Sequence, residues 1–116
     1  MTTEKIKAQP HKAPVADDEK NSSFFLRSLG ETTRLRALAF IVEGDYEIKF
    51  VAKIVGHTDV WESPYVPGKI EGSSVVYMPV SFLVPHNLRR IDLTYIVKNA
   101  AGETPSLARN LLIVNT

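Results

Sequence analysis

The chain has 116 residues, and 44% of them are hydrophobic, which leaves room for one globular domain with a short terminal extension. Its 14 basic and 13 acidic residues give a net charge of +1. This balance argues against a nucleic-acid-binding protein, which usually carries an excess of basic residues on one face. The absence of cysteine excludes a disulfide framework and any metal site built from thiolates.

The N-terminal residues 1–22 are polar and charged and include Pro10 and Pro14. Because they bury too little apolar surface to offset the entropy lost on ordering, we expect a flexible tail, or a tail that orders on a partner, ahead of a domain at residues 23–116. They lack the apolar stretch of a secretory signal, and the chain has no run of about 20 apolar residues that could span a membrane. We therefore expect a protein without a membrane span that is cytoplasmic, or exported without a standard signal peptide.

Short apolar segments open the predicted domain. Phe24–Leu29 predicts either a first strand or a short helical turn. In Leu35–Glu43 both alternating faces are fairly apolar, so periodicity does not separate strand from helix. Tyr46–Val55 is the clearest strand, because apolar side chains such as Ile48 and Phe50 alternate with more polar ones. This alternation is typical of a sheet with one buried face and one face in water.

The rest of the chain predicts further strands separated by turns. Residues 56–72 contain three glycines and two prolines, which indicates a long loop with at most one short edge strand. Ser73–Pro85 is typical of a strand that Pro79 kinks or confines to a sheet edge. Arg90–Val97 and the aliphatic end of the chain, joined by a turn rich in Asn, Gly and Pro, predict a hairpin. About seven short strands without a long helix indicate an all-β fold, an antiparallel two-sheet β-sandwich, since no helix is available to cover a sheet.

The last hairpin, TYIVKNAAGETPS at Thr94–Ser106, resembles the end of fibronectin type III and related immunoglobulin-like domains. Asn99, Gly102 and Ser106 match the Asn-x-x-Gly-x-x-x-Ser turn of those domains. The stretches GDYEIKFVAKIVG and PVSFLVP are similar to immunoglobulin-like repeats of bacterial surface and secreted proteins. The resemblance covers residues 35–114. It implies an immunoglobulin-like sandwich that serves as a spacer, adhesion or docking module, with no reaction and no cofactor.

No motif in the sequence indicates an enzyme. A serine hydrolase usually places its nucleophile in a G-x-S-x-G turn, and neither that motif nor a glycine-rich phosphate loop is present. His57 and Asp59 would share a face of an extended segment. They have no third ligand near them in sequence, because His11 lies in the predicted tail and His86 follows a proline. We therefore predict no catalytic residue, no metal site and no cofactor.

The loop at His57–Lys69 is the candidate binding site. It carries Trp61 and Tyr65 as well as His57, and aromatic side chains on loops often anchor interfaces or stack on sugars. The alternative is that both rings fold back to cover an open edge or end of the sandwich.

From these features we predict a non-enzymatic module that binds another protein or self-associates into a larger structure. The alternative is a module for a carbohydrate or small ligand that uses Trp61 and Tyr65, with His57 as a further contact. A nucleic acid is not an expected partner, and no membrane span is expected.

Overall fold

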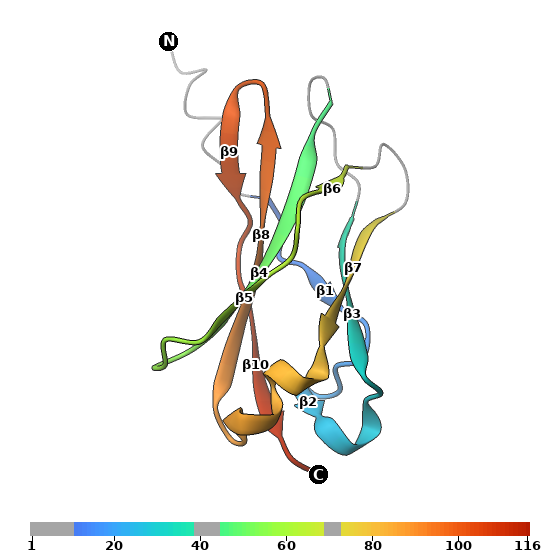
Figure 1. The fold of residues 1–116 in the computed structure, drawn as a ribbon, viewed down its shortest axis with the longest axis vertical. Coiled ribbons are helices and arrows are strands. Elements are labelled where there is room, and N and C mark those ends of the chain that lie inside the picture. Colours follow the sequence, from blue (N-terminus) through green and yellow to red (C-terminus); the bar gives the residue numbers. More distant parts are fainter. Residues whose placement is uncertain (1–10, 39–44, 69–72) are drawn as a thin grey trace.

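The computed structural model describes residues 11–38, 45–68 and 73–116 (Figure 1). These ranges are mostly β-structure arranged as two sheets, as the alternating sequence patterns predicted. Within them no helix is both long enough and apolar enough to cross a membrane. Their strands are β1 (Val15–Ala16), β2 (Ser23–Phe25), β3 (Thr32–Leu38), β4 (Glu47–Ile54), β5 (Val60–Glu62), β6 (Val66–Pro67), β7 (Ser73–Pro79), β8 (Arg90–Asn99), β9 (Gly102–Pro105) and β10 (Arg109–Val114), and their 3-10 helices are η1 (Leu26–Ser28), η2 (Val80–Phe82) and η3 (Val84–His86).

The larger sheet is built around the long strands β4 and β8. Its order is β2-β10-β8-β4-β5, with β6 also beside β4 and β9 also beside β8. β4 and β8 are antiparallel, and their register pairs Glu47 with Lys98 at one end and Ile54 with Ile91 at the other. β2 and β10 run parallel, so the prediction of a wholly antiparallel fold is wrong at this pair.

The smaller sheet has the order β1-β3-β7. β3 and β7 are antiparallel and pair over the whole length of β7, beginning with Thr32 opposite Pro79. Pro79 therefore lies in an edge strand of the described sheet, as expected for a residue without a backbone N–H. The prediction that Ser73–Pro85 forms one strand is wrong beyond Pro79, because η2 and η3 follow there.

Both sheets contribute side chains to one hydrophobic core. Alternate residues of β4 and β8 point into it, among them Phe50 and Tyr95, whose ring centroids lie 5.7 Å apart. β3 and β7 contribute Leu35 and Met78 from the other sheet. Lys49 and Lys53 are less buried than their neighbours in β4, as the alternation predicted, whereas Val51 on the same face is buried.

The structure differs from the predicted tail at residues 11–22, which pack against the sheets. β1 pairs with β3, and Ala16 is buried in the shared core. The carboxylate of Asp17 accepts hydrogen bonds from Arg34 and Arg36 on β3. The polar composition of this segment therefore reflects charges that pair with the sheet, and the earlier part of the predicted tail lies outside the described residues.

The sequence left two segments undecided between strand and helix, and the structure resolves them differently. Phe24–Leu29 contains both alternatives in succession, since β2 ends at Phe25 and η1 follows. Phe24 itself is fully buried in the core, which explains the apolar character of the segment. In Leu35–Glu43 the chain is a strand as far as Leu38, and the rest of that predicted element lies outside the described residues.

Two buried serines complete the hydrogen bonding of the central strands. Ser63 lies between β5 and β6; it donates its N–H to the Phe50 carbonyl at 2.9 Å, and its Oγ accepts the Phe50 N–H at 2.9 Å. Ser106 lies between β9 and β10 and makes the same two contacts with Tyr95, at 2.8 and 2.9 Å. Phe50 and Tyr95 are direct partners in the β4–β8 register. The four residues therefore form one row across the larger sheet, which we call the serine row.

Candidate functional site

Trp61, the first aromatic residue of the predicted binding loop, lies in β5 opposite Ala52 of β4. Directly paired residues of an antiparallel pair point to the same face, and Ala52 points into the core. The Trp61 ring is accordingly partly buried and packs against the core. This placement agrees with the alternative that the ring covers an edge of the core.

Tyr65 lies on the other face of the larger sheet. Its hydroxyl donates to the Glu103 carboxylate at 3.0 Å, and the ammonium groups of Lys49 and Lys98 lie 5.3 and 4.9 Å from its ring centroid. Burial, followed by the hydrogen bond to Glu103, raises the pKa of Tyr65. The ring is therefore held by contacts within the protein, through hydrogen bonding and cation–π attraction.

Trp61 and Tyr65 do not form one aromatic surface. The register places Val66, next to Tyr65, opposite Ile48, which leaves about 13 Å of β4 between this level and that of Trp61. His57 follows the far end of β4 and lies beyond Trp61 along the strand. A single small ligand cannot contact all three predicted residues in this arrangement, and carbohydrate binding stays a prediction.

His57 instead lies beside Asp59 and His86. Nε2 of His86 is 2.8 Å from Oδ2 of Asp59, and Nδ1 of His57 is 3.5 Å from Oδ1 of the same carboxylate. The two imidazole rings have centroids 4.9 Å apart and meet edge to face. His86 is far from His57 and Asp59 in the sequence and follows a proline, so it was not predicted as their third ligand. The fold brings it to the pair, and we call these three residues the histidine cluster.

Local structure positions each member of the histidine cluster. Gly56 has a φ of 77°, which favours glycine, and it turns the chain at the end of β4. After this turn the Asp59 N–H donates to Nδ1 of His57 at 3.1 Å. Pro85, whose ring fixes φ near the helical value, is the second residue of the short helix η3, which ends at His86. The proline that precedes His86 in the sequence therefore helps to set the position of the His86 side chain.

Hydrogen-bond partners determine where the His86 ring carries its proton. A carboxylate can only accept, so His86 donates to Asp59 from Nε2. Nδ1 of His86 is buried and has no hydrogen-bond partner in the described part of the protein. The His86 side chain is 3% exposed, whereas the side chains of His57 and Asp59 are 37% and 48% exposed. The cluster thus has one fixed, buried member and two that can adjust.

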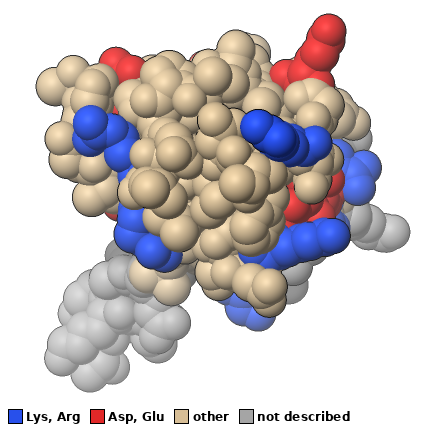
Figure 2. Space-filling model, turned by 90° about the horizontal axis from the view of Figure 1, so that it is seen from below, with Lys and Arg blue, Asp and Glu red and all other residues tan. Residues whose placement is uncertain are grey.

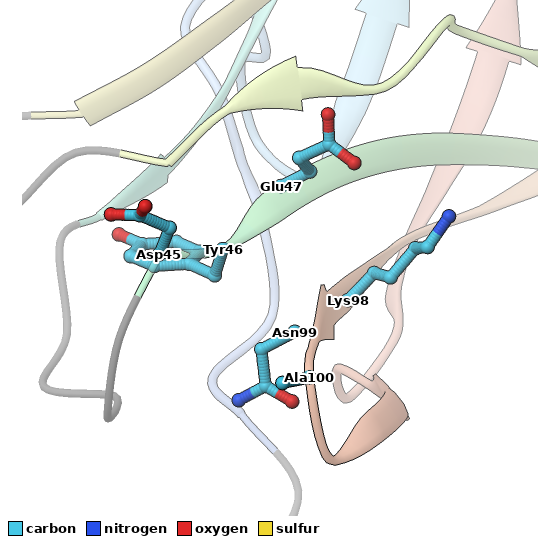
Figure 3. A pocket seen from close by; sticks show the side chains of 6 residues that line it. All are labelled: Asp45, Tyr46, Glu47, Lys98, Asn99 and Ala100. Atoms are coloured by element: carbon cyan, nitrogen blue, oxygen red, sulfur yellow. The ribbon is translucent and has the colours of Figure 1, made fainter.

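A pocket lies at the opposite end of β4, where the strand begins (Figure 3). Its volume is about 310 Å³, and two carboxylates, one ammonium group and one amide line it beside an aromatic ring. The ionisable side chains of the lining therefore carry a net charge of −1, which disfavours an anion. The lining residues are Asp45, Tyr46, Glu47, Lys98, Asn99 and Ala100.

The end of the molecule that carries η2 and η3 presents a largely uncharged surface with charged side chains of both signs around it (Figure 2). A hollow of about 540 Å³ lies there beside the end of β7, and Gly30, Pro79 and Val84 are among its lining residues. Val84 is 57% exposed and Tyr77, further along β7, is 60% exposed. Apolar and aromatic side chains therefore flank this edge of the smaller sheet.

Two features of the described residues can support a function: the free edge of β7 and the histidine cluster. The position of β7 at a sheet edge was expected from Pro79. The histidine cluster depends on tertiary contacts. Comparison with protein-family models, with curated proteins and with solved structures finds no match for this chain.

Proposed function

We propose that the chain is a non-enzymatic, immunoglobulin-like module that binds another protein, or a second copy of itself, through the free edge of β7. The observation that carries this proposal is the length of β7, seven residues, with β3 as its one strand partner among the described elements. An unpaired edge of this length presents a row of backbone N–H and C=O groups to which an extended segment of another chain can add.

The other sheet edges in the described ranges are shorter. The larger sheet ends at β5 and β2, with three residues each, and β1 closes the smaller sheet with two. Short edge strands are one means by which proteins avoid pairing with other chains. β7 is therefore the edge best suited to accept a strand.

The register identifies the backbone groups that β7 offers to a partner. Just past the paired segment, Val80 donates its N–H to the Glu31 carbonyl at 2.9 Å. Because hydrogen-bonded and non-hydrogen-bonded pairs alternate, the backbone groups of Val75 and Tyr77 point away from β3. Pro79 occupies an outward position as well, so its missing N–H removes no bond from the ladder with β3. The donors on the free edge therefore include those of Val75 and Tyr77.

Side chains near this edge suit an interface. Tyrosine is enriched at interface anchors, because its ring supplies a large contact area at a low entropy cost, and Tyr77 is well exposed. The hollow beside Pro79 and Val84 lies at the end of β7, where a side chain of the partner would contact these two apolar residues next to the carboxylate of Glu31. Backbone pairing would thus give affinity, and contacts with Tyr77 and with the hollow would give specificity.

Val75→Pro tests the proposal, because it removes an outward N–H and leaves the ladder with β3 in place. Val75→Thr is the matched control, since it keeps both the N–H and the β-branched shape. We expect light scattering of the full chain to show a dimer or larger assembly as concentration rises. Val75→Pro should convert this assembly to a monomer, whereas Val75→Thr should leave it unchanged.

If the full chain is monomeric at every concentration, the partner is a different protein. A display library of extended peptides should then yield sequences that bind the wild type and Val75→Thr but not Val75→Pro. An assembly that Val75→Pro leaves intact would contradict the proposal. So would a monomer for which no such peptide can be selected.

A further inference from the structure

We propose that the histidine cluster of His57, Asp59 and His86 binds a divalent transition-metal ion, and that Zn²⁺ fits it best. The cluster lies at the turn between β4 and β5 and at the end of η3. None of its three residues lies in β7 or lines the hollow at the end of β7, so this inference does not depend on the proposed protein-binding function.

The distances within the cluster are close to those that a metal ion needs. One ligand-capable atom of each residue lies within 4.8 Å of the other two. Zinc bonds of about 2.0–2.2 Å in a tetrahedron place ligand atoms roughly 3.4 Å apart. The exposed side chains of His57 and Asp59 can make the remaining shift of about 1 Å by small rotations. Burial fixes His86, so the third ligand needs no ordering when the ion binds.

The chemistry of the ligands selects the class of metal. Two imidazoles and one carboxylate suit Zn²⁺, Co²⁺, Ni²⁺ and Cu²⁺, whereas Ca²⁺ and Mg²⁺ prefer sites built from oxygen atoms. Three protein ligands leave a fourth tetrahedral position for water, and the exposure of His57 and Asp59 opens that position to solvent. No lysine or arginine of the described residues forms an ion pair with Asp59, so its charge is available to the cation.

One feature limits the expected affinity. A metal ion at Nε2 of His86 replaces the proton that now bonds to Asp59, and a neutral ring then carries its proton on Nδ1. That atom is buried and has no partner among the described residues, whereas a metal-bound histidine usually donates its other N–H to an acceptor. With this cost and only three ligands, we expect a dissociation constant on the order of micromolar, weaker than that of a closed four-ligand zinc site.

A purely structural role for the cluster makes a different prediction. The hydrogen bond between His86 and Asp59 could close the turn with no ion present, because it already joins η3 to the β4–β5 turn at 2.8 Å. In that case an added metal ion would bind weakly and at no fixed stoichiometry. Loss of His57, which makes the longer of the two contacts to Asp59, would then have no effect on metal affinity.

The test is a calorimetric titration of Zn²⁺ into the full chain, untagged and previously stripped of metal with a chelator. We expect one ion per chain, and no heat with Mg²⁺ or Ca²⁺. His57→Ala and Asp59→Asn should each weaken binding by at least about tenfold, and both positions are exposed, so the fold should persist. His11→Ala is the control, because His11 is the third histidine of the chain and lies outside the cluster.

Cobalt provides a second measurement that does not depend on heat. Co²⁺ bound in a tetrahedral site absorbs visible light far more strongly than the hydrated ion, and this absorption should be lost in His57→Ala but retained in His11→Ala. Absence of both the calorimetric heat and the cobalt absorption would overturn the proposal. Binding that His57→Ala and Asp59→Asn leave as tight as in the wild type would also overturn it, since the ion would then lie elsewhere.

Discussion

Ser63→Ala tests whether the serine row stabilises the larger sheet. In the wild type, the Oγ atom of Ser63 accepts the Phe50 N–H at 2.9 Å and donates to the Pro64 carbonyl at 2.8 Å. Phe50 is fully buried, so the substitution leaves its N–H without an acceptor and without access to water. A buried, unsatisfied donor costs about 1–3 kcal/mol. Because Pro64 is exposed, water can replace its lost donor, and the expected loss of unfolding free energy is about 2 kcal/mol.

Urea unfolding followed by circular dichroism measures this loss. With a denaturant slope of about 1–2 kcal/mol/M, the midpoint should fall by roughly 1–2 M, and the slope should stay the same. Ser81→Ala is the control, because Ser81 is exposed and its loss should change stability by less than about 0.5 kcal/mol. If Ser63→Ala costs no more than Ser81→Ala, the Phe50 N–H does not depend on the hydroxyl, and the proposed role of the serine row is refuted.

The two ends of the serine row should contribute independently. Ser106 makes the equivalent contacts with Tyr95, so Ser106→Ala should have a similar cost. Ser63 and Ser106 stand three strand spacings apart, roughly 14 Å, and substitutions at this distance usually add. The double variant should therefore lose about 4 kcal/mol, a large part of the ~5–15 kcal/mol typical of a domain.

Two further predictions concern the tyrosines of the core. A Cβ at Gly68 would lie 1.9 Å from the buried ring of Tyr46, so Gly68→Ala should lower the unfolding free energy by about 1–3 kcal/mol. Gly30→Ala, whose Cβ would meet no atom within 4 Å, should be neutral under the same urea assay, and equal losses would contradict the contact. Burial, with a smaller effect of Tyr46, raises the pKa of Tyr95 to about 12, so the unfolded chain loses this proton first. The stability that Tyr95 contributes should be complete below about pH 10 and lost as pH rises through about 12. Tyr95→Phe should therefore reduce the fall of the unfolding free energy with pH over this range. An unchanged pH dependence would contradict the assignment.

Local patterns in the sequence were sufficient to identify the long strands β4 and β8, but they missed β1 and β9 and allowed at most one strand where β5 and β6 both form. Alternation of apolar and polar side chains located β4, since Tyr46–Val55 contains Glu47–Ile54. The same patterns could not show that β2 runs parallel to β10, because the direction of a pair depends on which strands meet. They also could not show that Asp17 pairs with Arg34 and Arg36. A segment whose charges pair with distant residues has the same composition as a segment whose charges are solvated.

The candidate site was harder to predict, for two physical reasons. In a regular strand Trp61 and Tyr65 would point to the same face, because side chains alternate with a period of two. The register shifts by one residue between β5 and β6, where Ser63 and Pro64 interrupt the strand, and Tyr65 therefore points to the other face. His86 joins its partners only through tertiary contact, so no spacing rule could have placed it there.

The pairing of β4 with β8 also has a consequence for the rate of folding. The two strands are not neighbours in sequence: β5, β6, β7 and two short helices lie between them. Hairpins between β4 and β5 and between β8 and β9 close short loops and can form within microseconds, whereas the central pair must first close a much longer loop. We therefore expect folding on a timescale of roughly milliseconds to seconds. Until that loop closes, the apolar faces of both strands stay in water, and the nascent chain is most exposed to aggregation.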